Sequence, residues 1–392
     1  MRIEKIIPEI LGPSPEIHAT RRRALEAVTL AIVASGCLGI TSIGRAIAGS
    51  SKRKHAIKKV DRLLGNHHLH IERAYFWAAL AAYLVGDQRQ PILLVDWTKV
   101  TDGFHALVAA IPIGGRAMPV YIETHGEKNL GKASVQQRFL RNLATILPAK
   151  AQPIIVSDAG FHGAFFRATL ALGWNFVGRI RGLAKVRLTD DAPFIRATSL
   201  YPAATLRPWD MGVSDLYEHA TSVRARLVMV RGKRKPGRRA TPRNSSEQAK
   251  RESRRDPWTL ATSLTDLSVE KIVAIYALRM KIEETFRDAK NPRFGWSLRH
   301  VRSGSAKRLD VLLLLASLGM IATTVIGFEA ERLGLHRDYQ ANTVKSRVLS
   351  HFVLGLALLR HLGNGLFPDG REEWRALRVF QREIRALGME VT

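Results

Sequence analysis

The chain has 392 residues, 46% hydrophobic and 24% charged, so it can bury the core of one large domain or of several. Its 61 Lys and Arg against 34 Asp and Glu give a formal net charge of +27, which favours a polyanionic partner, above all nucleic acid. The single cysteine, Cys37, excludes a disulfide within the chain and a zinc site built from several cysteines, and is usual in a reducing cytoplasm.

Residues 1–88 are predicted to form a small basic helical module. The stretch HAIKKVDRLLGN places apolar side chains on one side of a helix and basic ones elsewhere. Two interpretations fit this pattern, a DNA-contacting surface and an amphipathic packing helix with a solvated basic face. The start, MRIEKIIPEILG, carries charges and prolines where an export signal needs an apolar run, so we expect no export.

Residues 89–182 alternate between strand and helix patterns and predict an α/β fold with a mixed sheet. Three strands able to form a meander come first, and a helix, a strand, a helix and a strand follow. The expected elements are PILLVDW (91–97), FHALVAAIPI (104–113), AMPVYIETH (117–125), a helix over 134–147 with Ser134 as N-cap, and then QPIIVSDAG (152–160), HGAFFRATLALG (162–173) and WNFVGRIRG (174–182).

The pattern changes again after residue 182. Residues 183–257 are expected to form a basic, partly β insertion, with a strand at 225–232 and a Lys/Arg-rich loop or arm at 231–257 that contacts phosphates or is simply solvated. Residues 258–300 return to a strand and a helix that starts near Ser268, and residues 301–392 are expected to be helical. The apolar run 311–328 reaches the length of a short membrane span, but its polar and glycine residues favour a buried helix, so we expect no membrane.

Two aspartates stand where apolar strands are predicted to end. Asp96 closes ILLVD, and Asp158 closes PIIVSD. If the two strands are parallel neighbours, both carboxylates emerge at one end of the sheet, where ligand sites form in α/β folds. Two ionised acids held together require a cation, and hard divalent ions such as Mg²⁺ prefer carboxylate oxygen. The alternative is that each aspartate caps the segment that follows it.

A third acid lies on the helix YALRMKIEETFRDAK. At 100° per residue one continuous helix places Glu283 on a narrow stripe beside an apolar face, whereas Glu284 and Asp288 point elsewhere and are expected to be solvated. The i,i+4 spacing also fits an exposed ladder of salt bridges around Glu283. The stripe consists of Tyr276, Arg279, Glu283, Arg287 and Lys290.

The spacing Tyr276-x2-Arg279-x3-Glu283-x6-Lys290 resembles the Y-R-E-K signature of a group of DDE insertion-sequence transposases, bacterial cut-and-paste enzymes. The segments VDW, VSDAGF, PWTLATSL, IEETFRD and QANTV are similar, in the same order, to members that flank the tetracycline-resistance composite transposon. The resemblance covers most of the chain. It implies an RNase H-like mixed sheet flanked by helices, with a helical N-terminal module, a β-rich insertion and a helical C-terminal region.

The resemblance also implies site residues. Asp96, Asp158 and Glu283 match the catalytic carboxylates, which would hold two Mg²⁺ ions, with Mn²⁺ as a substitute, for in-line phosphoryl transfer. Three of the residues expected to bind DNA, Tyr276, Arg279 and Lys290, match the signature and are expected to grip phosphates. Trp258 is expected to stack on a flipped base, and Arg179 and Arg181 resemble family arginines near DNA. Arg287, on the same helix stripe, is also expected to bind DNA. Met280 stands where relatives have Trp.

The expected function is therefore a transposase that cleaves terminal inverted repeats, forms and opens a hairpin, and joins the 3′ end to target DNA. Its expected partners are the double-stranded transposon ends and target and a second copy of the chain, and its expected place is the bacterial cytoplasm, on the nucleoid. The alternatives are an RNase H-like nuclease without strand transfer and a non-enzymatic DNA-binding repressor.

Overall fold

The structure is a computed structural model that describes residues 3–13, 15–47, 49, 52–218, 222–232, 256–293, 295–298, 301–362 and 371–391. The chain divides into two compact units, each discontinuous in sequence. The first unit comprises Met1–Lys132, Arg141–Ala151 and Met280–Glu390, and the second comprises Ala133–Leu140, Gln152–Arg279 and Val391–Thr392.

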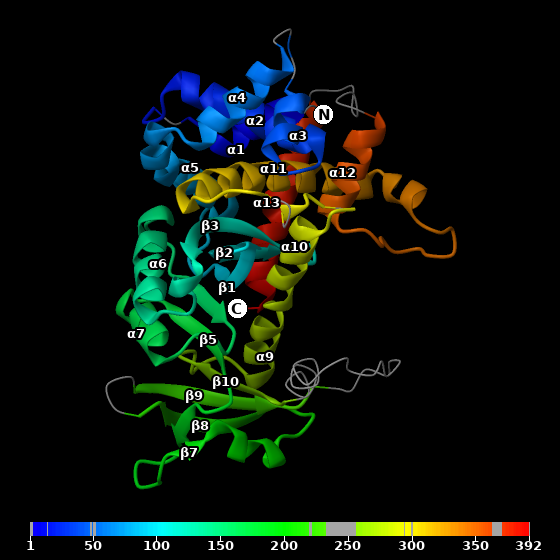
Figure 1. Ribbon diagram of the computed structural model, residues 1–392. Helices are drawn as coiled ribbons and strands as arrows, with labels where there is room; N and C mark the ends of the chain where they lie inside the picture. Colours follow the sequence, from blue (N-terminus) through cyan, green and yellow to red (C-terminus); the bar gives the residue numbers. More distant parts are fainter. Residues whose placement is uncertain are drawn as a thin grey trace, which may run out of the picture. The chain divides into compact units, whose positions relative to one another are not determined.

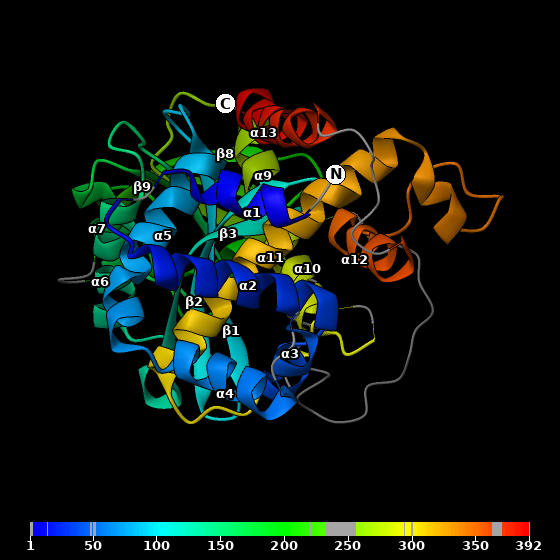
Figure 2. The same ribbon diagram turned by 90° about the horizontal axis from the view of Figure 1, so that it is seen from above.

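Five helices open the described part of the first unit, in the region where the sequence predicts helical structure (Figure 2). Their ends carry ordinary capping signals. The side chain of Asn66 accepts a hydrogen bond from the backbone N–H of Leu69, and Gly36 takes the left-handed conformation that closes a helix. The helices are α1 (Ile3–Leu11), α2 (Ala19–Ser35), α3 (Ile40–Ala46), α4 (Arg53–Leu64) and α5 (His67–Val85).

An antiparallel meander of three strands follows in the same unit, in the order β3, β2, β1. The strands are β1 (Ile92–Thr101), β2 (Phe104–Ile113) and β3 (Arg116–Gly126), with 3-10 helix η1 (Glu127–Asn129) after them. Asp96 lies opposite Val108, and Thr98 lies opposite Ala106. Because alternate residues of a strand point to the same face, Asp96 and Thr98 share one face of the meander.

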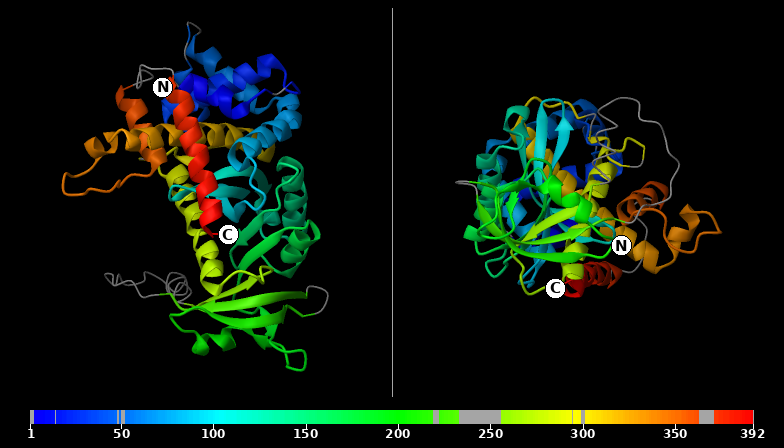
Figure 3. Two further views of the ribbon diagram at one scale, coloured as in Figure 1. Left: turned by 180° about the vertical axis from the view of Figure 1, so that it is seen from behind. Right: turned by 90° about the horizontal axis from the view of Figure 1, so that it is seen from below.

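The remaining helices of the first unit pack around this meander. Helix α10 (Met280–Lys290) contacts all three strands, and α11 (Ala306–Arg332) contacts β3 (Figure 1). 3-10 helix η5 (Leu335–Tyr339), α12 (His351–Leu362) and α13 (Arg371–Val391) complete the unit, and Figure 3 shows α13 as one long helix. The ring of Phe380 on α13 stacks on Tyr83 of α5, with centroids 6.4 Å apart.

Helix α11 carries the apolar run and is long and apolar enough to cross a membrane, as is the bent pair α2 and α3 if it is taken as one span. However, 94% of the apolar window of α11 is buried inside the protein, so its composition is explained by core packing, as the sequence analysis expected. Helix α12 lies unusually close to it. A Cβ on Gly355 would meet the carbonyl oxygen of Thr323 at 2.0 Å, and a Cβ on Gly327 would meet that of His351 at 1.9 Å.

The second unit is built on a mixed sheet in the order β4, β5, β10, β9, β8, β6, β7. Strands β4 and β5 are parallel and the other described pairs are antiparallel. Its core includes Phe166, which stacks on Phe176 with centroids 4.5 Å apart. The elements are β4 (Ile154–Ser157), α7 (Gly163–Ala171), β5 (Asn175–Ile180), β6 (Lys185–Arg187), β7 (Ile195–Arg196), η2 (Ala197–Ala203), β8 (Trp209–Leu216), β9 (Val223–Val230), β10 (Trp258–Thr262) and α9 (Val269–Ala277).

The mixed α/β fold class predicted from the sequence is confirmed, but some local predictions are wrong. Helix α6 (Ala133–Ile146) begins after Lys132, so Ser134 lies inside its first turn and is not the N-cap. Strand β1 runs five residues beyond Asp96, because the alternation of more and less buried residues continues through WTKVT. Most of the predicted basic arm, residues 233–255, lies outside the described residues. The division into five consecutive domains stays a prediction.

Candidate functional site

Asp96 lies in the middle of β1 and is only 9% exposed. Its Oδ1 accepts a hydrogen bond of 2.8 Å from the backbone N–H of Trp97. Two residues further along the same face, the Oγ1 of Thr98 accepts a hydrogen bond of 2.6 Å from the Nζ of Lys290, which is at the end of α10. The structure therefore brings the strand acid and the predicted phosphate-binding lysine to one face of the meander, although 192 residues separate Thr98 from Lys290.

Glu283 lies in the first turn of α10 and is exposed. Lys290 follows it by seven residues, or almost two full turns, so both side chains leave the helix on the same side. Helix α10 packs on the face of the meander that carries Asp96 and Thr98, since Lys290 reaches Thr98 there. Within the first unit, two predicted carboxylates and one predicted DNA-binding cation thus belong to adjoining elements.

Glu284 and Asp288, the two acids of α10 other than Glu283, both form ion pairs. Arg287, whose side chain is 67% exposed, forms an ion pair with Glu284 three residues before it. The prediction that Asp288 is solvated is wrong, because its side chain is 12% exposed and binds Arg116, a residue 172 positions away. Pattern analysis missed this pair because nothing local marks its partner.

The second unit carries Asp158, which directly follows β4 as predicted. Its Oδ1 accepts a hydrogen bond of 2.8 Å from the backbone N–H of Gly160, so the side chain closes a local turn. The carbonyl of Gly160 in turn accepts a bond of 3.4 Å from Gln136 at the start of α6. This turn agrees with the capping alternative for Asp158, and the metal-binding role of its carboxylate stays a prediction.

Three predicted DNA-binding residues form one group in the second unit. The ring of Trp258, at the start of β10, packs edge-on against Tyr276 of α9, with centroids 4.9 Å apart. The guanidinium of Arg279 lies 5.9 Å from the centre of the Tyr276 ring. Burial raises the pKa of Tyr276, while the charges of Arg279 and Arg179 oppose that rise. The charge of Asp158 also raises the pKa of Tyr276, so this acid lies close enough to the Tyr276 hydroxyl to affect it electrostatically.

Arg179 and Arg181 have partners inside the second unit. The Nη2 of Arg179 donates hydrogen bonds to the carbonyl oxygens of Asp256 (3.4 Å) and Pro257 (3.3 Å). The Nε of Arg181 lies 3.0 Å from the carboxylate of Asp256, with which it forms an ion pair. Both arginines thereby hold the segment that leads into Trp258. The DNA-binding role of both arginines stays a prediction.

The signature residues do not lie on one continuous helix. Helix α9 ends at Ala277 and α10 begins at Met280, and between them Leu278 and Arg279 form i→i−3 backbone hydrogen bonds. Such bonds turn the chain by about 120° per residue instead of 100°. The predicted stripe from Tyr276 to Lys290 therefore does not hold across the break, and Tyr276 is buried, with 2% of its surface exposed.

A buried acid on the opposite face of the meander shows how a purely structural carboxylate is satisfied here. Glu123 of β3 accepts hydrogen bonds from Tyr121 (2.8 Å) and Asn142 (2.7 Å) and contacts the ring nitrogen of His125 at 3.1 Å. Burial alone would raise the pKa of Glu123, but these hydrogen bonds outweigh it and lower the pKa. Glu123 therefore has a complete set of protein donors and needs no cation.

Carboxylate oxygen is the donor that Mg²⁺ prefers, and the residue types at 96, 158 and 283 fit such an ion. Asp96 and Glu283 belong to the first unit and Asp158 to the second. Among the residues that the structure describes, no three His, Cys, Asp or Glu side chains are grouped so that they hold a metal ion. Convergence of the three acids on one metal site is therefore a proposal.

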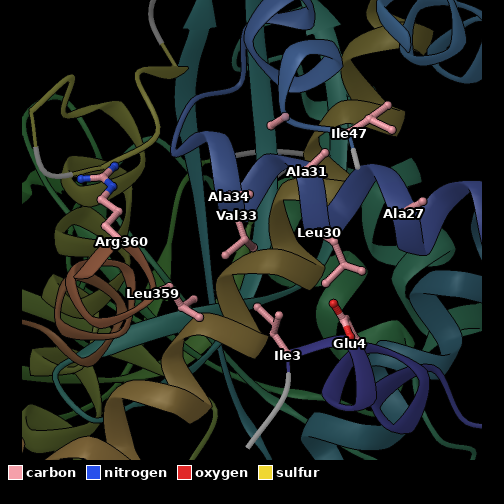
Figure 4. A pocket seen from close by; sticks show the side chains of 11 residues that line it. Ile3, Glu4, Ala27, Leu30, Ala31, Val33, Ala34, Ile47, Leu359 and Arg360 are labelled. Atoms are coloured by element: carbon pink, nitrogen blue, oxygen red, sulfur yellow. The ribbon is translucent and has the colours of Figure 1, made fainter. Parts of the chain in front are cut away.

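A pocket of about 520 Å³ lies among the helices of the first unit, and none of the three acids lines it (Figure 4). Its lining comes from α1, α2, α12 and the end of α3 and is mainly small or aliphatic. Glu4 and Arg360 are its charged members. An apolar lining with one acid does not suit phosphoryl-transfer chemistry, so this pocket is not the candidate active site.

A sequence model described as a transposase DDE domain matches residues 87–320, which is more than half of the chain. The match includes all three candidate acids, Asp96, Asp158 and Glu283, and every residue predicted to bind DNA. No curated protein matches the chain.

Proposed function

This chain belongs to the transposase DDE domain family, and from that premise we propose that it is a cut-and-paste transposase of an insertion sequence. As a member of this family, the chain is an enzyme that binds DNA, cleaves it and transfers the cut strand, and it has an RNase H-like fold. The net charge of +27 agrees with a DNA partner. What we add is the division of roles among its residues and the course of the reaction.

We assign the metal-binding role to Asp96, Asp158 and Glu283. The ions that they would hold, two Mg²⁺ or in their place Mn²⁺, would increase the nucleophilicity of the attacking oxygen and stabilise the charge on the leaving oxygen. The observation that supports this assignment is the hydrogen bond from Lys290 to Thr98, which is two residues from Asp96 on the same face of β1. Thr98 is a residue that the sequence analysis did not single out.

The remaining residues would hold the DNA. Lys290 and Arg279 bind phosphates on either side of the scissile bond, and the Tyr276 hydroxyl contributes a further hydrogen bond. Trp258 is half-buried against Tyr276, so one part of its ring remains available to stack on an unpaired base. Arg287 is exposed and adds a phosphate contact at the end of α10.

In the proposed reaction water attacks a phosphorus atom at the transposon end, and the bond to the 3′ oxygen breaks. The released 3′-OH attacks the phosphorus opposite it, which forms a hairpin and frees the flanking DNA. Water then opens the hairpin, and the 3′-OH finally attacks target DNA. Two copies of the chain would pair the two ends, and the reaction would take place on the nucleoid in the bacterial cytoplasm.

The test uses a labelled DNA fragment that contains one end of the element, taken from the DNA flanking the gene. Wild-type protein is compared with Asp96→Asn, Asp158→Asn and Glu283→Gln in Mg²⁺, and with Glu284→Gln as a matched control on the same helix. We expect cleavage by wild type and control and loss of cleavage in the three variants, with gel-shift binding in EDTA retained. Full activity in all three variants would refute the assignment. Cleavage without hairpin or joined products would instead identify a nuclease.

A further inference from the structure

Helix α10 carries Glu283 and Lys290, yet it cannot set its own position. It has eleven residues, and isolated helices of that length are marginally stable in water. It begins directly after the break at Leu278 and Arg279, where the i→i−4 ladder is interrupted. Its position must therefore come from contacts with the rest of the first unit.

The first such contact is made by Thr285, which is 4% exposed. Its Oγ1 accepts a hydrogen bond of 2.8 Å from the backbone N–H of Ala117, and lies 3.0 Å from the carbonyl oxygens of Ala117 and Lys281, to either of which the hydroxyl can donate. Ala117 is on β3, and Pro112, its partner on β2, has no N–H to donate. The Thr285 hydroxyl thus accepts a bond from the N–H of Ala117 and lies within hydrogen-bonding distance of its carbonyl oxygen.

The second contact is made by Asp288, one turn further along α10. Its Oδ2 accepts hydrogen bonds from the Nε of Arg116 (2.7 Å) and the Oγ of Ser350 (2.8 Å), and its Oδ1 accepts a longer one from Arg116 Nη2 (3.4 Å). The pair is largely shielded from water, with 12% of the Asp288 side chain and 22% of the Arg116 side chain exposed. A two-pronged bond between guanidinium and carboxylate fixes orientation as well as distance.

Together these two contacts fix the rotation of α10 about its axis. Thr285 and Asp288 are three residues apart and share one side of the helix. Glu283 precedes Thr285 by two residues, or about 200°, so it must point away from β3 when Thr285 is bound there. The side chain of Lys290 leaves α10 on the same side as that of Glu283, because the two residues are seven positions apart. The same two anchors therefore determine the direction of the acid and of the lysine that meets Thr98.

We propose that Thr285 and Asp288 are positioning residues of the transposase, which orient Glu283 and Lys290 by anchoring α10 to the first two residues of β3. This inference rests on the proposed function, in which Glu283 is a catalytic carboxylate. Neither anchor touches substrate in this account, so both act through the helix. A displacement of about 1 Å at a catalytic group can reduce turnover a hundredfold, which makes such anchors functional as well as structural.

The experiment compares full-length Thr285→Val, Thr285→Ser and Asp288→Asn with wild type and with Glu284→Gln. Valine keeps the shape of threonine without the hydroxyl, and serine keeps the hydroxyl. The measured quantities are turnover at saturating end DNA, the KM for that DNA, and the Mg²⁺ concentration that gives half-maximal cleavage. Far-UV circular dichroism reports whether each variant is folded.

We expect Thr285→Val to lower turnover about tenfold or more and to raise the half-maximal Mg²⁺ concentration, with a smaller rise in the KM for DNA because Lys290 is one of several proposed phosphate contacts. Thr285→Ser should recover most of the turnover, and Glu284→Gln should behave as wild type. If Thr285→Val does not fold, Asp288→Asn provides the same comparison, because it keeps the shape of the side chain and removes its charge.

Two outcomes separate this inference from the proposed function. Folded Thr285→Val and Asp288→Asn proteins with wild-type turnover and Mg²⁺ dependence would overturn the positioning role while Glu283→Gln remained inactive. An equal loss in Thr285→Ser and Thr285→Val would also overturn it, because the hydroxyl would then be irrelevant. Full activity of Glu283→Gln would instead refute the proposed function itself.

Discussion

The crossing of α11 and α12 yields a quantitative prediction for Gly355→Ala. The new Cβ would lie 2.0 Å from the carbonyl oxygen of Thr323, about 1 Å inside the closest approach that Cβ atoms show to other atoms. Because the obstacle is backbone, it cannot rotate away, and α12 must shift. Overpacking of this kind lowers the free energy of unfolding by about 1–3 kcal/mol, whereas the higher helix propensity of Ala over Gly raises it by about 1 kcal/mol. We expect the upper part of that range and a net loss of about 2 kcal/mol in the free energy of unfolding.

The assay is urea unfolding followed by circular dichroism, with Gly304→Ala as the control. A Cβ on Gly304 meets nothing within 4 Å, so this change should be neutral or slightly stabilising. Gly327→Ala should destabilise for the same reason as Gly355→Ala, since its Cβ would lie 1.9 Å from the carbonyl oxygen of His351. The double variant should cost less than the sum, because a helix that has moved away for one methyl makes room for the other. A Gly355→Ala protein as stable as wild type would refute the close crossing.

Three further predictions concern charge and stacking. Burial lowers the pKa of His351, which pairs with Glu331, to about 4. The resulting contribution to the free energy of unfolding, about 3 kcal/mol at most, should be present above pH 6.5 and be lost as the pH falls from 6.5 to 4. His351→Gln should flatten this part of a curve of stability against pH. Arg287→Gln should reduce by about one the slope of a plot of the logarithm of the binding constant for end DNA against the logarithm of the salt concentration. Glu284→Gln, which removes the ion-pair partner of Arg287, should leave that slope unchanged. Trp258→Ala should weaken binding of an end with an unpaired base by about 1–3 kcal/mol and Trp258→Phe by less, and equal affinities would exclude stacking.

The strands and most helices follow from the sequence because their patterns are local. PIIVS is apolar without interruption and ends at Asp158, and the structure has β4 there. The sequence does not mark WTKVT as a strand, since Lys99 interrupts the apolar run although the alternation of buried and exposed residues continues. For that reason the sequence predicts Asp96 at the end of a strand, whereas it lies in the middle of β1.

The site is less predictable than the fold, because its contacts join residues far apart in the chain. The prediction that Asp288 is solvated assumed one regular helix and local partners, whereas its partners are Arg116 and Ser350. The contact of Lys290 with Thr98 has no local signal either. A family resemblance names such residues, but it does not state which side chains hold them in place.

The central claim is that Asp96, Asp158 and Glu283 share a pair of divalent ions. Iron-mediated cleavage tests it most directly: Fe²⁺ replaces Mg²⁺, and ascorbate with peroxide then cuts the polypeptide next to the bound metal. We predict cuts near residues 96, 158 and 283 in the same sample, suppressed by excess Mg²⁺ and lost together in Asp158→Asn. Cuts near one of these acids alone, or a pattern unchanged in that variant, would contradict the account.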